Sequence, residues 1–67
     1  MGKVYKKIEV VGCSDESIEK AIEAALAKAG ETVQGMAWFE VMETRGAIVD
    51  NAVAEYQVTL NVGFKID

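Results

Sequence analysis

The chain has 67 residues, with 11 acidic and 7 basic side chains, a net charge of −4, one cysteine and no histidine. This length favours a single domain, residues 1–67, whose core alone supplies roughly 3–5 kcal/mol of stability. One cysteine excludes an internal disulfide, and the lack of histidine argues against structural zinc, so oligomerisation is the expected source of further stability. The negative charge argues against general nucleic-acid binding, which needs basic side chains to neutralise phosphates.

The cellular location can be inferred only from what the sequence lacks. No apolar run approaches the ~20 residues of a membrane-spanning helix. The first residues carry lysines where a secretory signal has an apolar segment. A single free thiol fits a reducing compartment. We therefore expect a cytoplasmic protein without a membrane partner.

The first two predicted elements are a strand and a helix. Side chains alternate in character over residues 3–11, which is typical of a strand, and Gly12 is expected to end it. Ser14 is the predicted helix N-cap, and Gly30 the predicted stop. Between them, apolar residues recur at the spacing of one helical face: Ile18, Ala21, Ile22, Ala25, Leu26 and Ala29.

Two further strands are expected after the helix. The second runs over residues 33–48, with bulges or bends at Gly35 and Gly46. A turn at residues 49–52 precedes the third strand, which alternates almost perfectly from Tyr56 onward. Placing the third strand between the other two makes every pairing antiparallel. The predicted fold is therefore α+β, in the order β-α-β-β, with a three-stranded antiparallel sheet of strand order 1-3-2.

The lengths of the predicted elements do not match. A helix of about 15 residues spans roughly 23 Å, whereas a strand of about 14 residues spans roughly 46 Å. The sheet must therefore wrap partly around its single helix, or have its ends and outer face covered by other chains. Both outcomes indicate an assembly.

Trp38 is the most informative residue of the second strand. On a regular strand Phe39 and Val41 face the core, so Trp38 faces the opposite side, which it shares with Gln57. An indole on this outer face suggests a flat surface for stacking. The partner could be another subunit, a planar ligand, or both.

The sequence offers no catalytic site. Glu40 and Glu43 are three positions apart and should lie on opposite faces of a regular strand, so they are poor candidates for an acid–base pair. Cys13 has no histidine to activate it, and we expect a small buried thiol near the helix start. We expect neither catalytic nor metal-binding residues.

Three segments resemble the dodecins, small flavin-binding proteins that assemble as hollow twelve-subunit shells. These segments read K-V-Y-K-K-I-E-V-V-G at residues 3–12, W-F-E-V-M-E-T-R-G at 38–46 and Y-Q-V-T-L-N-V-G-F-K at 56–65. The resemblance covers nearly the whole chain, including a serine-started helix. The chain departs from the family at Cys13, where relatives often carry a hydroxyl residue.

This resemblance implies a function. Dodecins bind flavins as antiparallel stacked pairs, sandwiched between symmetry-related tryptophans across two-fold axes, and they store flavins and protect against their photochemistry. By position, Trp38 resembles the stacking residue, and Gln57 the glutamine that hydrogen-bonds the polar edge of the isoalloxazine ring. The resemblance therefore implies a homododecamer without catalytic turnover.

The basic side chains of Arg45 and Lys65 allow more than one interpretation. Arg45 and Lys65 could bind the phosphate of flavin mononucleotide (FMN) or of coenzyme A, which some bacterial relatives bind. For Arg45, an ion pair between subunits with Glu40, Glu43 or Glu55 is at least as good an explanation. Arg45 and Lys65 favour FMN over riboflavin, since the family's phosphate-free binders are mainly halophilic proteins with far more acidic surfaces, and the charge of −4 here is moderate.

Other functions stay open on the residues alone. Trp38 could simply anchor a subunit interface, which would make the protein a structural or interaction oligomer. A shell that binds coenzyme A without a flavin role is a further alternative.

Overall fold

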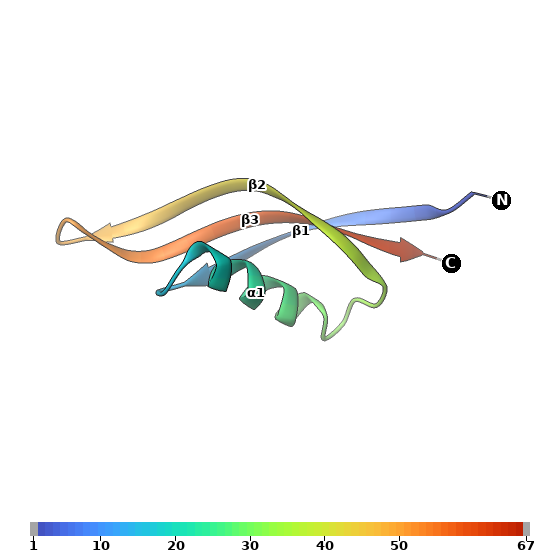
Figure 1. The fold of residues 1–67 in the computed structure, drawn as a ribbon, viewed down its shortest axis with the longest axis horizontal. Helices are drawn as coiled ribbons and strands as arrows, with labels where there is room; N and C mark the ends of the chain where they lie inside the picture. The colour runs from blue at the N-terminus through green and yellow to red at the C-terminus, as the bar shows by residue number, and fades with distance from the viewer. Residues whose placement is uncertain (1, 67) are drawn as a thin grey trace.

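The computed structural model describes residues 2–66, so the two ends of the predicted domain, residues 1 and 67, lie outside it. Its elements are β1 (Val4–Ser14), α1 (Ile18–Ala29), β2 (Met36–Val49) and β3 (Ala52–Ile66) (Figure 1). The strands form one antiparallel sheet in the order β1-β3-β2. The predicted α+β fold and strand order are confirmed. Within residues 2–66, no helix has both the length and the apolar character needed to cross a membrane.

Helix α1 begins later than expected. The side chain of Ser17, not Ser14, is the N-cap, accepting a hydrogen bond of 3.0 Å from the amide of Lys20. Ser14 is the last residue of β1, and its hydroxyl accepts a hydrogen bond of 3.0 Å from the amide of Glu16. The prediction of Ser14 as the cap was wrong because β1 continues past Gly12.

Gly12 is a contact point between the strand and the helix. A Cβ at this position would lie 2.0 Å from the backbone oxygen of Ala21 and 2.8 Å from Cβ of Ala25. Only glycine allows so close an approach, which explains its presence inside a strand. Gly12 therefore brings α1 onto the sheet and does not end β1.

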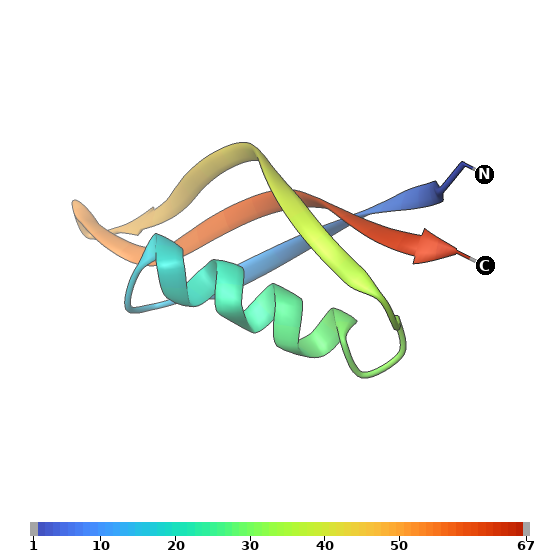
Figure 2. The ribbon, with the colours of Figure 1, turned by 45° about the vertical axis from the view of Figure 1, so that its right-hand side comes forward.

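The core lies between α1 and the middle of β3. Its buried members are Ala21, Ala25, Val58, Leu60 and Val62, with Ile8, Val10, Ile22 and Leu26 packed around them. The apolar stripe expected on the helix is thus the stripe that packs against the sheet. Figure 2 shows the sheet curving over the helix, which packs mainly against β1 and β3. The expected partial wrapping of the sheet around the helix is observed.

The strands extend beyond both ends of the helix (Figure 1). The extents are 55 × 20 × 13 Å, and the radius of gyration is 13.9 Å, against about 11 Å for a compact domain of this length. Phe39 and Val41, on the helix side of β2, remain 44% and 46% exposed. An apolar groove of about 230 Å³ lies between Leu26 and the start of β2. So much open apolar surface favours association with other chains.

Strand β2 is irregular, and this corrects a prediction. Register shifts occur at Ala37, at Met42 and between Ala47 and Ile48. Each glycine was predicted to mark a bulge or a bend inside the strand. Gly35 instead lies just before β2, where the backbone has φ +77°, and Gly46 pairs without a shift, so neither glycine forms a bulge.

The shift at Met42 changes which side chains share a face. Glu40 lies opposite Asn61 and Glu43 opposite Thr59, and both partners belong to the outer face of β3. The two carboxylates therefore share a face, contrary to the prediction for a regular strand, because Met42 is an extra residue between them.

The β2–β3 turn is as expected. Asp50 and Asn51 both have positive φ, 53° and 64°. This is the backbone of a tight two-residue hairpin turn, which asparagine and aspartate tolerate well.

Candidate functional site

Trp38 lies on the outer face of the sheet, away from α1. It is opposite Gly63 on β3, whose neighbour Val62 is fully buried on the helix side. A Cβ on Gly63 would lie 2.3 Å from Cζ2 and 2.4 Å from Cε2 of Trp38. The six-membered ring of the indole thus covers bare backbone at Gly63. Trp38 is nevertheless 40% exposed, so the indole is supported by the sheet yet accessible.

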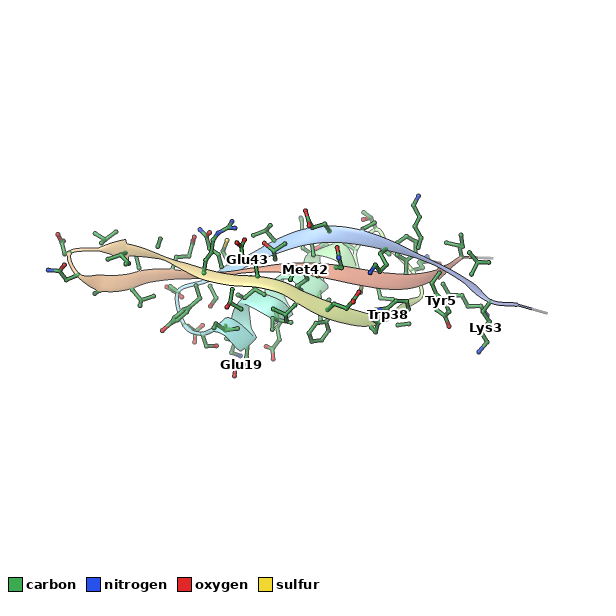
Figure 3. The ribbon with its side chains drawn as sticks, turned by 90° about the horizontal axis from the view of Figure 1, so that it is seen from above. Lys3, Tyr5, Glu19, Trp38, Met42 and Glu43 are labelled. Carbon is green, nitrogen blue, oxygen red and sulfur yellow. The ribbon has the colours of Figure 1, made fainter. Side chains whose placement is uncertain are left out.

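Tyr5 packs against the edge of this tryptophan. The two ring centroids are 5.1 Å apart, and the ring planes make an angle of 65°. This edge-to-face arrangement is a favourable one for aromatic pairs. Figure 3 shows Tyr5 and Trp38 beside each other, toward the end of the sheet that carries the N-terminus.

An ion pair crosses the sheet next to Trp38. Nζ of Lys7, on β1, lies 2.9 Å from Oε1 of Glu40, on β2, so the pair spans the central strand. Lys7 lowers the pKa of Glu40 by hydrogen bonding and by its charge, and the neighbouring Trp38 side chain adds a smaller lowering. The Glu40 carboxylate is therefore held in its charged form, chiefly by Lys7.

A second polar cluster surrounds Gln57. Nε of Arg45 donates to Oε1 of Gln57 at 2.6 Å, and Nη1 of Arg45 lies 2.7 Å from Oε1 of Glu43. Nε2 of Gln57 donates to Oε1 of Glu55 at 2.7 Å. Both ends of the Gln57 amide therefore have partners, so its orientation is fixed in the isolated chain.

The four predicted ligand residues fall into two groups. Arg45 and Gln57 are direct partners on adjacent strands. Lys65 is exposed and lies two residues from Gly63, the position that Trp38 covers. Gln57 is six residues from Gly63 along β3, which corresponds to about 20 Å. One chain alone does not bring Trp38 and Gln57 together.

The structure bears on two expectations about neighbouring residues. Arg45 pairs with Glu43 within this chain, and its ion pair between subunits stays a prediction. Cys13 lies opposite Gln57 in the register and is exposed, so the prediction of a buried thiol was wrong. The reason is again the length of β1, which carries Cys13 along the edge strand and not into the helix start.

Sequence reasoning missed the residues that surround Trp38. Gly63 interrupts an otherwise regular alternation of larger side chains, and a glycine inside a strand marks a close approach by another group. That signal could have been recognised. The roles of Tyr5, Lys7 and Glu40 could not, because their proximity to Trp38 depends on the register across three strands.

A model of the dodecin family matches residues 4–67 of this chain. A dodecin from Thermus thermophilus is 57% identical over 67 residues, covering 100% of this chain and 97% of the relative. A crystal structure of a Thermus thermophilus protein superposes with a TM-score of 0.95 at 56% identity, covering 98% of this chain and 97% of that one. A dodecin from Streptomyces davaonensis gives a TM-score of 0.95 at 37% identity, covering 100% and 98%.

These matches extend over the whole described fold, including the strand that carries Trp38 and the strand on which it rests. The recognition made from the three sequence segments is therefore confirmed. The chain belongs to the dodecin family.

Proposed function

We propose that this protein is a flavin-binding storage and photoprotection protein. It forms a homododecamer and holds stacked flavin pairs between symmetry-related copies of Trp38. The observation that carries this proposal is the support of the indole. One part of it lies against bare backbone at Gly63, while 40% of the residue is open on the outer face.

The chemistry of the indole suits a flavin. Indole is an electron-rich flat ring and isoalloxazine an electron-poor one, and offset stacking contributes about 0.5–1.5 kcal/mol beyond the area buried. Contact with an electron donor also quenches the excited state of the flavin. A protein that stores a photoreactive molecule needs both properties.

The distance between Trp38 and Gln57 supports a site built from two chains. About 20 Å along one strand is too far for one isoalloxazine ring to touch both residues. A two-fold axis between antiparallel sheets can instead bring Trp38 of one chain toward Gln57 of a neighbour. The Gln57 amide has both a donor and an acceptor for the ring edge. It would then exchange its present contacts with Arg45 and Glu55 for the ligand.

FMN is the favoured flavin, and coenzyme A is a second candidate ligand. Lys65 and Arg45 are the candidate phosphate-binding residues. Arg45 already has two partners in the chain, Gln57 and Glu43, so a phosphate must compete with a carboxylate there. Lys65 lies on the Trp38 side of the sheet and is exposed. We also propose that the chain is a single domain, that it is not an enzyme, and that it acts in the cytoplasm.

The test is a titration of FMN and riboflavin with purified protein, following flavin fluorescence. The proposal expects strong quenching at micromolar protein, tighter for FMN, and a flavin absorption spectrum for protein purified with its ligand. Failure to quench either flavin would contradict it.

A structural or interaction oligomer is the second candidate. The exposed apolar side chains of β2, Phe39 and Val41 among them, favour assembly whether or not a flavin binds. If this were the whole function, the purified protein would be colourless, and Trp38→Ala would break the assembly.

A further inference from the structure

We propose that Glu43 is a specificity-determining residue, whose carboxylate competes with the phosphate of a flavin for Arg45 and so limits the preference for FMN over riboflavin. This inference rests on the proposed flavin-binding function and deepens it at the polar cluster around Gln57. The observation that carries it is that Arg45 is already paired with an acidic side chain of its own strand.

The cluster lies on the outer face of β2 and β3. Glu43 is opposite Thr59 and Arg45 opposite Gln57, with no register shift between these two pairs, so all four side chains share this face. Nη1 of Arg45 lies 2.7 Å from Oε1 of Glu43, and its Nε donates to Oε1 of Gln57 at 2.6 Å. The guanidinium is therefore held at two points, by one charged and one neutral acceptor.

A ligand can still reach Arg45, but it meets Glu43 there. The side chains of Arg45 and Glu43 are 49% and 58% exposed. Two of the five N–H groups of the guanidinium are engaged by Glu43 and Gln57, so a phosphate has to use the others or displace the carboxylate. If the carboxylate stays, its charge repels the phosphate beside it. Either way, Glu43 weakens the binding of a phosphate at Arg45.

This effect distinguishes the two flavins. FMN and riboflavin have the same isoalloxazine ring, so contacts of Trp38 and Gln57 with the ring are common to both. Only FMN carries a charged phosphate. The ratio of the two Kd values therefore isolates the contribution of Arg45 and Glu43. Because the pair is exposed, its influence on that ratio should be modest, about two- to fivefold.

The experiment measures Kd for FMN and for riboflavin by quenching of flavin fluorescence. Glu43→Gln keeps the size of the side chain and removes its charge, and it should raise the preference for FMN about two- to fivefold. Glu9→Gln is the matched control, since it removes an exposed carboxylate from the same face, on β1, and should leave the preference unchanged. An unchanged preference in Glu43→Gln, as expected if Lys65 alone holds the phosphate, would overturn the inference. An equal rise in Glu9→Gln would overturn it too, by assigning the effect to the overall charge of the face.

A second pair of variants tests whether Glu43 acts through Arg45. In an Arg45→Met background the guanidinium is gone, so Glu43→Gln should no longer change the preference for FMN. An undiminished effect there would contradict the proposed competition. If Glu43→Gln does not fold or assemble, Glu43→Asp decides the question by the same two titrations. It withdraws the carboxylate by one methylene at constant net charge and should give a smaller rise, and no rise would overturn the inference.

The role of Glu43 can also be measured without a flavin. Arg45 is the only arginine in the chain, so its Nε–H signal is unambiguous in ¹⁵N NMR spectra. Titration with inorganic phosphate, followed at this signal, should show tighter binding in Glu43→Gln than in wild type. If wild-type protein quenches neither flavin and this difference is found, the flavin function is wrong and the role of Glu43 stands. If wild-type protein quenches both flavins, and Glu43→Gln binds neither phosphate nor FMN more tightly, the flavin function stands and the role of Glu43 is wrong.

Discussion

Replacing Gly63 by alanine is the sharpest test of how Trp38 is supported. The new Cβ would lie 2.3 Å from Cζ2 and 2.4 Å from Cε2 and Cη2 of the indole. Non-bonded carbons are stable at about 3.5–4.0 Å, so the ring must move by about 1–2 Å. Because the clash is with the rigid ring and not with the end of a flexible chain, the whole side chain has to shift. The edge contact with Tyr5 is lost in the process.

The expected consequence is a loss of flavin affinity together with a loss of folding stability of comparable size. Forfeiting the stacking geometry costs about 0.5–1.5 kcal/mol, equivalent to a Kd about two- to tenfold weaker. Overpacking at Gly63 costs about 1–3 kcal/mol of folding stability. Part of that cost is offset, since alanine loses less conformational entropy on folding than glycine does.

The assay is quenching of FMN fluorescence, combined with the emission spectrum of Trp38 in the protein without flavin. Gly2→Ala is the matched control, because nothing lies within 4 Å of a Cβ at that position. We expect Gly63→Ala to shift the tryptophan emission and weaken FMN binding, with Gly2→Ala unchanged in both. Wild-type affinity and emission in Gly63→Ala would refute the account of the indole resting on bare backbone.

Two further predictions concern the helix cap and the outer-face carboxylate. Ser17→Ala should lower folding stability by about 1 kcal/mol in thermal or denaturant unfolding, and Ser14→Ala by less, because only Ser17 caps α1; equal losses would contradict this assignment. The pKa of Glu40 is depressed below its ordinary value of 4.5, chiefly by Lys7. The ionised Glu40 therefore contributes fully to folding stability above pH 4.5, and this contribution disappears as the pH falls through the lower pKa of the folded state. The midpoint of unfolding should therefore fall in that acid range, and it should fall less in Glu40→Gln. Glu9, across Asn61 from Glu40 on the same face, provides the control variant Glu9→Gln, in which the wild-type transition should persist.

Regular periodicity in the sequence was enough to predict the architecture. The apolar stripe from Ile18 to Ala29 coincides with α1, and the alternation after Tyr56 gives the buried side chains of β3. The strand order follows from the half-polar character of all three strands. These features are set by local patterns, which a single sequence displays.

The irregular positions could not be predicted in the same way. The sequence of β2 predicts a regular strand, which would put Glu40 and Glu43 on opposite faces. They share a face because Met42 is an extra residue, and this bulge is defined only by the pairing of β2 with β3. Ser14 and Ser17 are both good N-caps by residue type. The close contact of Gly12 with Ala21 decides between them, and that contact is tertiary.

The candidate site was predicted in its residues but not in its arrangement. The alternation of side chains along β2 predicted Trp38 on the outer face. The register shift at Ala37 leaves this prediction intact, because it changes only the face on which Met36 lies. The separation of Trp38 from Gln57 follows from the register with β3, which the sequence does not show. The same register brings Lys7 and Tyr5 toward Trp38 from the opposite edge of the sheet.

Trp38→Ala, studied by gel filtration and by FMN titration on the same preparation, tests the central claim most directly. The account predicts that the variant assembles to the same size as wild type and no longer quenches FMN at micromolar protein. An assembled variant that still quenches FMN like wild type would contradict the stacking role. Loss of assembly, with a wild-type protein that binds no flavin, would assign Trp38 to the subunit interface.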